Sequence, residues 1–492
     1  MWNPSAILAL IAQGLSYRSS SDGEFCCSLL NDKLSSTIYP SSPSYNASNI
    51  YFANQAILHP TCIHSPSSAS DLSRAIKLLS SRSCQFAIRG GGHYVPAGYA
   101  NINNGVLISL SLFKEVTVHP DYARIGAGNY WGDVYKVLES QNVMVAGAAV
   151  STVGVPGFLL GGGMTLRSGE YGFGCDGVRG FQIVLGSGEI LYVARGDKKH
   201  QELFRALKGG GSSFGVVAAF DMDITPSVPV YGGTYIYPES SIPRLLKLMA
   251  EYTVDPDPKS NVIAVFSYAT ATDTILPAFI SFYDGHVDTT SPPASVAPFL
   301  SSGLGMLINT AVMRNTSQVS EEVGTSTDYG FRQLVTSIMI DADDHTLSDL
   351  YDIYSQEFVA LKGIVKSVNL GCRSIPHSAI VMGKKMGGNS LGLEAKGNLQ
   401  HIFWLATWES PSQDAFIEDV VINRMVKRSS DLTRSRGLLN RFQYMNYAWT
   451  DQSPIESYGL ESVRRLRKVK KEYDTDGVFT YLVKGGWKIP DR

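Results

Sequence analysis

The sequence predicts an α+β protein with two parts, and three observations support this prediction. Short strand-like and helix-like segments alternate in residues 54–225. The composition changes near residues 225–229, and longer strand and helix patterns with fewer glycines follow up to about residue 440. A length of 492 residues, with 44% apolar and 17% charged residues, is enough for two domains or one large discontinuous unit.

These patterns divide the chain into four segments. We expect a lead-in at residues 1–53, rich in Ser, Pro and Asn and loosely structured between 16 and 50. A first domain follows at 54–225, and a second domain at 226–440. The C-terminal segment, 441–492, returns to short motifs, and we expect it to rejoin the first domain.

The first domain begins with a helix. In residues 71–81, Leu72, Ala75, Ile76 and Leu79 fall on one helical face, and Ser70 is a suitable cap. Strands are then expected at residues 86–88, 106–110, 116–118 and 123–125, the last two forming a hairpin around a His-Pro-Asp turn. A short helix follows around Val134, Val137 and Leu138.

The second domain shows longer patterns. Residues 262–266 and 278–282 predict strands, and residues 347–361 predict a helix. Asp341, Asp343, Asp344 and His345 precede that helix, and capping by Asp explains them better than a metal site does. The later basic run at 464–471 carries apolar residues at helical spacing, which predicts a surface helix with a solvated basic face.

Composition and charge exclude several functions. A net charge of -2 gives no long-range field for nucleic acid, and no apolar stretch reaches the ~20 residues of a membrane-spanning helix. Residues 6–12 resemble a short signal segment without a basic start, and Asn46 and Asn315 lie in glycosylation sequons. The chain also has six cysteines, and none of them shows the paired spacing of zinc ligands. We therefore expect a monomeric glycoprotein of the secretory pathway. The alternative is a cytoplasmic protein, in which the sequons occur by chance and the cysteines are buried free thiols.

Three glycine clusters dominate the first domain, at residues 89–93, 154–163 and 207–215. Consecutive glycines can expose successive backbone N–H groups, and such an array binds phosphate oxygens. None of the clusters has the spacing of a P-loop or a Rossmann fingerprint. We therefore favour a dinucleotide-binding site of another type over a purely structural role of the glycines in turns. His93 is the last residue of the first cluster, and a neutral imidazole is a competent nucleophile.

With these motifs in order, the chain resembles the berberine-bridge-enzyme-like, FAD-linked oxidases of the vanillyl-alcohol oxidase superfamily, especially fungal members of secondary metabolism. The matching segments are residues 89–93, 151–163, 171–176, 188–190, 204–210, 214–217, 444–447 and 473–479. The resemblance implies a discontinuous, two-lobed PCMH-type FAD-binding domain. It also implies a substrate domain with an antiparallel sheet backed by helices.

The resemblance also assigns roles to individual residues. It implies that His93 bonds covalently to the flavin 8α-methyl group. The residues expected at the cofactor are His93, Arg89, Gly90, Gly91, Gly92, Ser151, Val153, Gly154, Gly157, Gly161, Gly162, Tyr171, Gly172, Cys175, Asp176, Val217 and Asn446. From secreted relatives it further implies that Cys26 or Cys27 pairs with Cys84. No metal is expected.

Two positions depart from the family pattern. Many members form a second flavin bond through a cysteine, and this chain has Val150 there, so a single link is expected. Pro156 stands where glycine is usual and leaves the surrounding N–H donors in place. Val153 falls where the family controls oxygen access, and valine is compatible with O2 as the electron acceptor.

The resemblance makes Tyr447 the candidate base and places Tyr444 in the substrate cavity, on a tyrosine-bearing strand. Strand alternation would put Tyr444 and Asn446 on one face and Tyr447 on the other. A phenol also needs a neighbouring cation or hydrogen-bond donor to act as a base near neutrality. Aromatic core packing is the alternative explanation for these residues.

The expected reaction is oxidation of a small organic molecule by hydride transfer to the tethered flavin, with O2 as the electron acceptor. One alternative keeps the flavin but makes the protein a cyclase or pericyclase that shapes its substrate with little net redox. A second alternative is a non-catalytic binding protein on a degenerate flavin fold.

Overall fold

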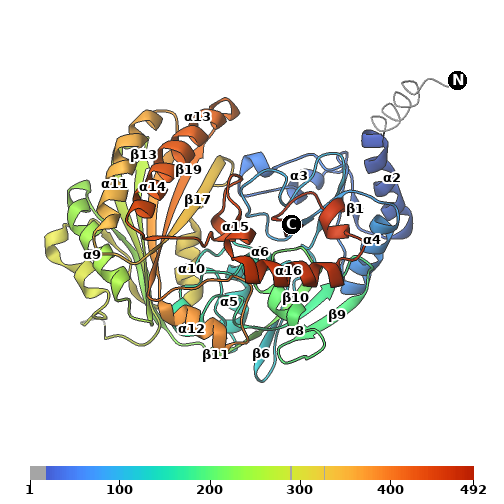
Figure 1. Ribbon diagram of the computed structural model, residues 1–492, viewed down its shortest axis with the longest axis horizontal. Helices are drawn as coiled ribbons and strands as arrows, with labels where there is room; N and C mark the ends of the chain where they lie inside the picture. The colour runs from blue at the N-terminus through green and yellow to red at the C-terminus, as the bar shows by residue number, and fades with distance from the viewer. Residues whose placement is uncertain (1–17, 289–290, 326, 492) are drawn as a thin grey trace.

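The computed structural model describes residues 18–288, 291–325 and 327–491. Two lobes lie side by side, each around its own apolar core (Figure 1). The first lobe combines N-terminal and C-terminal segments, and the second holds a large sheet with helices on its outer side. This arrangement confirms the predicted α+β class.

The first lobe is built on two sheets. One has the order β1-β2-β4-β3, with β2, β4 and β3 parallel. The other is antiparallel, with the order β5-β6-β10-β8-β9. The strands are β1 (Thr37–Ile38), β2 (Cys62–His64), β3 (Phe86–Arg89), β4 (Val106–Ser109), β5 (Val116–Val118), β6 (Tyr122–Gly126), β8 (Val178–Val184), β9 (Ile190–Ala194) and β10 (Val216–Asp223), beside the short pair β7 (Val143–Met144) and β11 (Thr225–Pro226).

The helices of this lobe cover the two sheets. They are α2 (Arg18–Lys33), α3 (Tyr45–Ser48), α4 (Ala69–Ser81), α5 (Trp131–Glu139), α6 (Val155–Leu160), α7 (Ser168–Tyr171) and α8 (Gln201–Leu207). Helix α4 buries the predicted apolar face. Its cap, however, is Ser68 instead of Ser70, because the Ser68 hydroxyl accepts from the Asp71 N–H at 3.2 Å and the helix begins two residues earlier.

The second lobe is organised around an antiparallel sheet of nine strands, called here the large sheet. Its order is β15-β12-β14-β13-β18-β19-β17-β20, and β16 also pairs with β12. The strands are β12 (Val230–Ile236), β13 (Ser260–Ala269), β14 (Thr274–Tyr283), β15 (Ile308–Asn309), β16 (Val312–Arg314), β17 (Arg332–Asp341), β18 (Ser367–Ile375), β19 (Leu399–Trp408) and β20 (Leu439–Asn440). The helices are α9 (Ile242–Val254), α10 (Thr316–Thr325), α11 (Thr346–Glu357), α12 (His377–Lys385), α13 (Asp414–Glu418), the π-helix η7 (Asp419–Val426) and α14 (Lys427–Ser435).

The two faces of the large sheet have different surroundings. Alternate residues of β13, such as Val262, Ala264 and Phe266, join the core that α9 and α11 cover on the side away from the first lobe (Figure 1). The residues between them, Ile263 and Val265, belong to a small separate cluster on the opposite face. That second face, called here the inner face, is turned toward the first lobe.

The last fifty residues contact the first lobe. They form the 3₁₀ turn η8 (Met445–Tyr447), α15 (Pro454–Ser457), α16 (Leu460–Tyr473) and the π-helical turn η9 (Val478–Leu482). The Tyr458 hydroxyl donates to the Gly209 carbonyl at 3.0 Å, and Val483 forms a bridge with Phe86 of β3. Helix α16 is the predicted basic surface helix, with Val463, Leu466 and Val469 buried.

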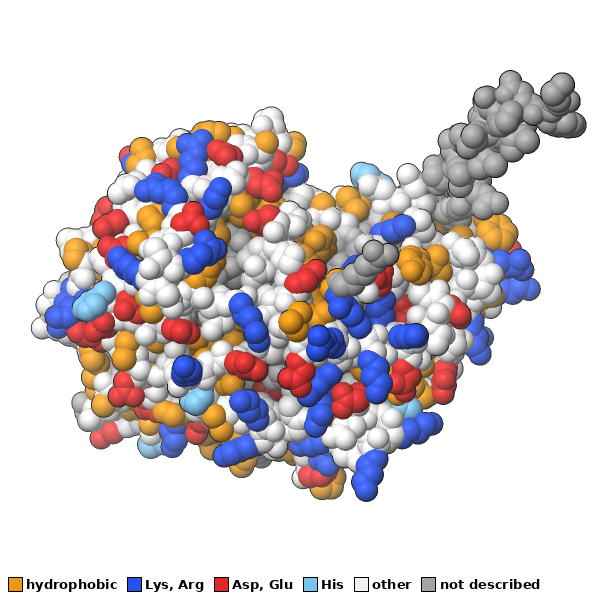
Figure 2. Space-filling view, viewed as in Figure 1, with side chains coloured by type: hydrophobic (Ala, Val, Ile, Leu, Met, Phe, Trp, Pro, Cys, Tyr) orange, Lys and Arg blue, Asp and Glu red, His pale blue; other side chains and the backbone are white. Residues whose placement is uncertain are grey.

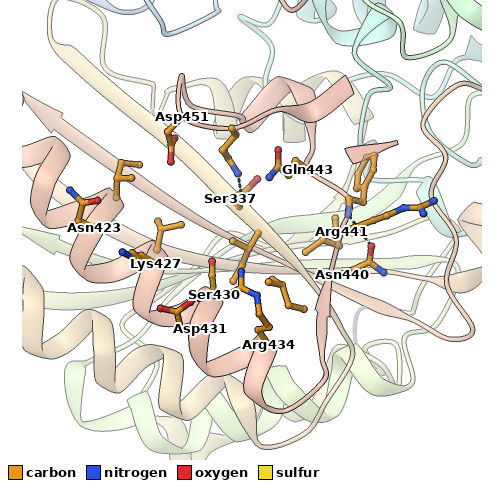
Figure 3. A pocket seen from close by; sticks show the side chains of 17 residues that line it. Ser337, Asn423, Lys427, Ser430, Asp431, Arg434, Asn440, Arg441, Gln443 and Asp451 are labelled. Carbon is orange, nitrogen blue, oxygen red and sulfur yellow. Dashed lines mark hydrogen bonds and ion pairs between the residues drawn. The ribbon is translucent and has the colours of Figure 1, made fainter. Parts of the chain in front are cut away.

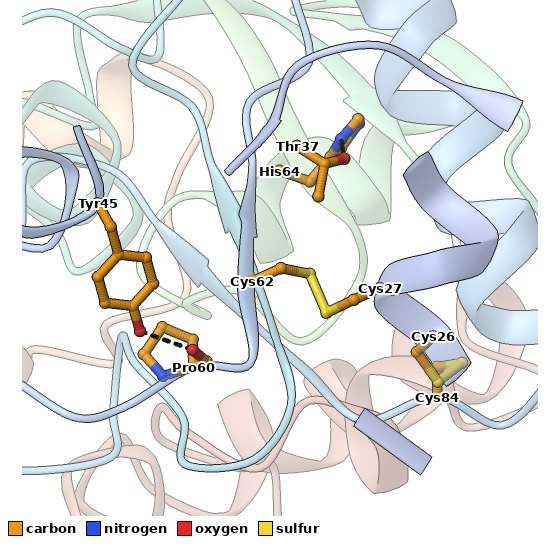
Figure 4. The surroundings of a disulfide bond; sticks show 8 residues. All are labelled: Cys26, Cys27, Thr37, Tyr45, Pro60, Cys62, His64 and Cys84. Atoms are coloured by element: carbon orange, nitrogen blue, oxygen red, sulfur yellow. Dashed lines mark hydrogen bonds between the residues drawn. A yellow bond between two sulfur atoms is a disulfide. The ribbon is translucent and has the colours of Figure 1, made fainter. Parts of the chain in front are cut away.

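The expectation of a loosely structured lead-in is wrong. Residues 18–33 form helix α2, and two disulfides bind it to the first lobe (Figure 4). Cys26 pairs with Cys84, as the resemblance implied, and Cys27 pairs with Cys62, which was not foreseen. The cross-links hold a segment whose own sequence gives little helical periodicity.

The surface carries charges of both signs, which are interspersed over the visible face (Figure 2). Within the described ranges, no helix is long and apolar enough to cross a membrane. The acidic cluster before α11 acts as a cap, since the Asp343 carboxylate accepts from the N–H groups of His345 and Thr346. No group of potential metal ligands occurs among the residues that the structure describes.

Candidate cofactor and active site

The three glycine clusters, far apart in the sequence, meet in the first lobe. Gly91 and Gly154 are in backbone contact: a Cβ atom built on Gly91 would lie 2.6 Å from the Gly154 Cα atom. The Gly211 N–H donates to the Leu160 carbonyl at 3.1 Å, which joins the third cluster to the second. Glycine is required where the first two clusters meet, because any side chain would separate them.

The last two N–H groups of the first cluster have no hydrogen-bond partner among the described residues. The Gly91 carbonyl accepts from the Tyr130 hydroxyl at 3.2 Å, and the Gly92 carbonyl accepts from the Phe52 N–H at 3.0 Å. In a planar trans peptide the next N–H points away from the carbonyl. The N–H groups of Gly92 and His93 therefore point the other way, and neither has a partner among the described residues.

This arrangement fits the diphosphate of FAD. Adjacent unpaired N–H donors form a concave anion site, and Gly92 adopts the required positive φ of 69°. Gly157, in the second cluster, is exposed and has open space beside its Cα atom. The chain thus offers donors and room at the point where the glycine clusters converge.

His93 lies at the edge of this cradle and is half-buried. Its ring stacks on Phe52, with centroids 4.3 Å apart and planes 16° from parallel, and its Nε2 atom is 3.5 Å from the Thr152 hydroxyl. Burial lowers the pKa of His93 to about 4. The imidazole is therefore neutral at physiological pH, the form that acts as a nucleophile.

Other predicted cofactor residues hold the glycine clusters in place through hydrogen bonds. Arg89 donates to the carbonyls of Ser48 and Ile50, so its guanidinium holds the N-terminal segment against the first cluster. The turn at 172–176 holds the second cluster, because the N–H groups of Gly174 and Cys175 donate to the carbonyls of residues 163 and 162. These contacts give Arg89 and Cys175 positioning roles in the structure.

The remaining predicted residues fall into three groups. Asp176 is buried and accepts from the Phe173 N–H and from Asn389, and Gly172 packs against its carboxylate. Ser151 and Val153 are half-buried on the segment that faces α10, where the Ser151 N–H donates to the Ser320 carbonyl. Val217 is a buried residue of β10, and Tyr171 is half-buried at the end of α7.

The tyrosine-bearing segment is not a strand, which corrects the prediction. Residues Met445–Tyr447 form the 3₁₀ turn η8, preceded by Tyr444 in an extended conformation. Side chains three residues apart are eclipsed in a 3₁₀ turn, so Tyr444 and Tyr447 stack with centroids 5.6 Å apart. Both tyrosines therefore lie on the same side, which strand alternation would not allow.

Hydrogen bonds fix this turn to the glycine cradle. The Tyr444 hydroxyl accepts from the Met164 N–H at 2.8 Å and from the Asn446 amide, which also donates to the Phe158 carbonyl. The hydroxyl of Tyr94, the residue after His93, lies 3.2 Å from the carbonyls of both Met445 and Ala448. Burial raises the pKa of Tyr444 to about 12, so Tyr444 stays neutral.

Tyr447 projects between the lobes, and its ring meets residues of β19. Its centroid lies 5.1 Å from that of His401 and 5.5 Å from that of Phe403. Arg373, on the neighbouring strand β18, is the cross-strand partner of His401 and therefore shares the inner face. Burial raises the pKa of Tyr447, and the Arg373 charge acts in the opposite direction.

Sequence reasoning missed both His401 and Arg373. His401 is 1% exposed and neither ring nitrogen has a hydrogen-bond partner; burial holds its pKa well below the usual value. Arg373 supplies the cation that the Tyr447 hypothesis required. The available signal was one basic residue within each of two strand-like segments, 367–375 and 399–408.

A separate pocket of about 630 Å³ lies between β17, the helices η7 and α14, and residues 439–452 (Figure 3). Its lining includes Lys427, Asp431, Arg434 and Asp451, so both signs of charge face it. His93, Arg373 and Tyr447 are not part of its lining. The pocket is therefore distinct from the site between the lobes.

The fold and this site define a class of protein, the FAD-dependent oxidoreductases, here with a glycine-rich lobe and a second lobe built on a large antiparallel sheet. Sequence comparison agrees: residues 60–194 match the FAD binding domain family, and residues 443–482 match the family described as berberine and berberine like. The chain belongs to the berberine-bridge-enzyme-like family.

Relatives cover nearly the whole chain. FAD-dependent monooxygenase tpcD of Cochliobolus heterostrophus is 33% identical over 90% of this chain and 87% of its own length. FAD-dependent monooxygenase sdcF of Emericella nidulans is 32% identical, over 95% of this chain and 98% of its own length.

Solved structures share the fold at lower identity. The 6-hydroxy-D-nicotine oxidase of Arthrobacter nicotinovorans superposes with a TM-score of 0.78 at 20% identity, covering 93% of this chain and 98% of that one. The xylooligosaccharide oxidase of Myceliophthora thermophila gives 0.76 at 16% identity, covering 95% and 99%.

Proposed function

We propose that the protein oxidises a small organic molecule, of the secondary-metabolite type, with FAD tethered covalently through His93 and O2 as the electron acceptor. The observation that supports this most directly is the neutral, half-buried imidazole of His93 at the edge of an unpaired N–H cradle. The glycine clusters bind the diphosphate, and His93 supplies the nucleophile for the link to the 8α-methyl group.

The residues between the lobes perform the remaining steps. Bound FAD supplies the hydride acceptor and the path of electrons to O2. The inner face covers the substrate, and the phenolate form of Tyr447, which the Arg373 charge stabilises, accepts the substrate proton. For each substrate oxidised, one hydride and one proton leave it, and O2 becomes H2O2.

A single link to the flavin is part of this proposal. The position of the second, cysteinyl link in other members is Val150, which has no thiol. In the described chain the two free cysteines, Cys175 and Cys372, are buried elsewhere. Acid-precipitated protein should retain yellow flavin, and peptide mapping should find it on the peptide that contains His93 alone.

His93→Ala is the matching test. The variant should bind FAD reversibly and lose it on acid precipitation, since the glycine cradle is intact. Retention of covalent flavin by this variant, or a colourless wild-type protein, contradicts the proposal. A colourless protein would favour the non-catalytic alternative.

Reaction type is tested on the loaded wild-type protein. Anaerobic bleaching of the flavin by substrate supports oxidation, and turnover without bleaching supports the cyclase alternative. Because fungal relatives are named monooxygenases, the oxygen balance also matters. One H2O2 per product, without ¹⁸O from labelled O2 in the product, supports an oxidase; incorporated ¹⁸O supports a monooxygenase.

Entry into the secretory pathway belongs to the same proposal, with a monomeric glycoprotein as the product. Two disulfides within the first lobe suit an oxidising compartment. Both sequon asparagines, Asn46 and Asn315, are exposed. The signal-like residues 6–12 lie outside the described residues. Removal of N-glycans by an endoglycosidase should lower the mass of the protein from its native host.

A further inference from the structure

The pocket between β17, η7 and α14 lies outside the site between the lobes and has no part in the proposed reaction (Figure 3). Its volume of about 630 Å³ is suited to a small organic molecule. The π-helix η7 supplies Ile422, Asn423 and Val426 to its lining. Because π-helical segments are rare and frequently lie at functional sites, this pocket is a candidate for a second binding site.

Three of the five charged side chains that line the pocket are engaged with the protein itself. Arg434 pairs with Asp431 at 2.6 Å. Arg441 donates to the Gly392 carbonyl at 3.2 Å, and its guanidinium packs against Gly459. The charges of these three side chains are therefore held by neighbouring groups.

Lys427 and Asp451 are the other two, and they differ in this respect. The Lys427 ammonium, at the start of α14, has no ion pair or hydrogen bond with any residue that the structure describes. The Asp451 carboxylate, in the loop after the Tyr447 turn, accepts no hydrogen bond from another described residue, and partial burial raises its pKa. The two charges come from different walls of the pocket (Figure 3). A cation and an anion that both lack partners are complementary to a zwitterion.

The lining also offers one neutral donor and one neutral acceptor. The Gln443 oxygen accepts from the Ser453 N–H at 2.7 Å, and the Gln443 Nε2 group has no acceptor among the described residues. The Asn423 Nδ2 group donates to Asp419 at 3.0 Å, and the Asn423 oxygen receives no hydrogen bond in the described part of the chain. A peptide bond carries one C=O acceptor and one N–H donor, so it matches this pair.

Apolar side chains form much of the remaining lining. Ile338 comes from β17, Ile422 and Val426 come from η7, and Leu439 comes from β20. Ile422 and Leu439 are half-buried, so part of their surface is open to a ligand. An apolar group that covers this surface is removed from water together with it, which favours binding.

We infer that this pocket binds a short peptide with free termini and apolar side chains. The ammonium group of the peptide pairs with Asp451, and its carboxylate pairs with Lys427. The peptide bond between them accepts from Gln443 and donates to Asn423. The inference is independent of the proposed oxidation, because no residue assigned to the flavin or to proton transfer lines the pocket.

The experiment measures peptide binding to the purified holoprotein by calorimetry. The probes are leucyl-phenylalanine, its N-acetyl derivative, which lacks the ammonium group, and its amide, which lacks the carboxylate. The free dipeptide should bind with a dissociation constant below about 1 mM, and each blocked peptide roughly tenfold more weakly. Equal affinity for all three peptides, or no binding of the free dipeptide at about 10 mM, overturns the inference.

Two substitutions assign each terminus to its residue. Asp451→Asn should weaken binding of the free dipeptide and of the amide about tenfold, and leave the N-acetyl peptide unchanged. Lys427→Gln should weaken the free dipeptide and the N-acetyl peptide, and leave the amide unchanged. Both side chains are exposed, so the unfolding midpoint should not change.

The control is Lys247→Gln, which removes an exposed ammonium paired with Glu251 on α9 and should change no dissociation constant. Wild-type affinity in both pocket variants, or an equal loss for all three peptides, overturns the inference. Flavin content is measured on the same samples. A colourless protein that binds the dipeptide refutes the proposed function and supports this inference.

Two further probes test the apolar side chains and the peptide bond. Glycyl-glycine keeps both charges and the peptide bond but should bind more weakly than leucyl-phenylalanine, because it has no apolar side chain. Equal affinity for the two would contradict the apolar part of the inference. L-phenylalanine carries both charges on one carbon and has no peptide bond, and binding as tight as that of the dipeptide would overturn the choice of a peptide.

Discussion

The two faces of the large sheet are formed by the same strands but have different roles. Outer residues such as Phe266 and Trp404 are fully buried under helices, and the outer face is part of a continuous apolar core. The inner face alternates with it residue by residue and carries Arg373 and His401 beside half-buried aliphatic side chains. Along one strand, residues that stabilise the core thus alternate with residues that face the candidate active site.

The largest test of this division is Trp404→Ala. Trp404 is 0% exposed on the outer face, and its loss should lower the free energy of unfolding by ~3–5 kcal/mol. The midpoint of urea unfolding measures the change. A cost as small as that of an inner-face truncation would show that the outer face is not the main source of stability.

Tyr447→Phe tests the chemical face. Loss of the proton acceptor should slow anaerobic flavin reduction at least about a hundredfold, with little effect on the unfolding midpoint. Stopped-flow absorbance of the flavin gives the rate. The control is Tyr481→Phe, which removes a hydroxyl from a tyrosine that is 64% exposed on η9 and should leave the rate unchanged. If Tyr447→Phe reduces its flavin at the wild-type rate, Tyr447 is not the base.

The inner face should also make stability depend on pH. Burial holds the pKa of His401 well below its usual value, so unfolding lets this histidine bind a proton once the pH falls below about 6.5. Stability is therefore lost as the pH drops, by at most about 1.4 kcal/mol per pH unit. His401→Phe should flatten the difference in unfolding midpoint between pH 7 and pH 5. An unchanged slope would assign the pH dependence to other groups, such as His93.

The smallest expected effect compares two valines of one strand. Val262 is on the outer face and Val265 on the inner face. Val262→Ala should cost ~2 kcal/mol of unfolding free energy, and Val265→Ala less than about 1 kcal/mol because Val265 is already half-exposed. Equal costs would mean that the inner face is as tightly packed as the outer one.

Local sequence signals identified the first lobe well. The glycine clusters, His93 and the hairpin at 116–126 depend on residues that are close in sequence and on backbone conformations that few residue types adopt. The family resemblance then pointed to the cofactor. Helices α4 and α16 were predicted for the same reason, because the apolar residues of each helix recur within a few turns of sequence.

The active site could not be completed from sequence because it depends on register. Arg373 and His401 come together only through the pairing of β18 with β19, and strands that are buried on both faces do not show which residues point inward. Tyr444 to Tyr447 has the composition of a strand, but hydrogen bonds to the cradle favour a 3₁₀ turn. Helix α2 escaped notice because disulfides, more than periodicity, hold it.

Tyr94 connects the histidine of the cradle to the turn that bears Tyr447. Its backbone follows the histidine of the cradle directly, while its hydroxyl contacts the carbonyls on both sides of the turn that bears Tyr447. A displacement of the loop is therefore passed to the turn through the rigid ring of Tyr94. The positions of His93 and Tyr447 are thus coupled by the residue that lies between them in space, although 354 residues separate the two in the sequence.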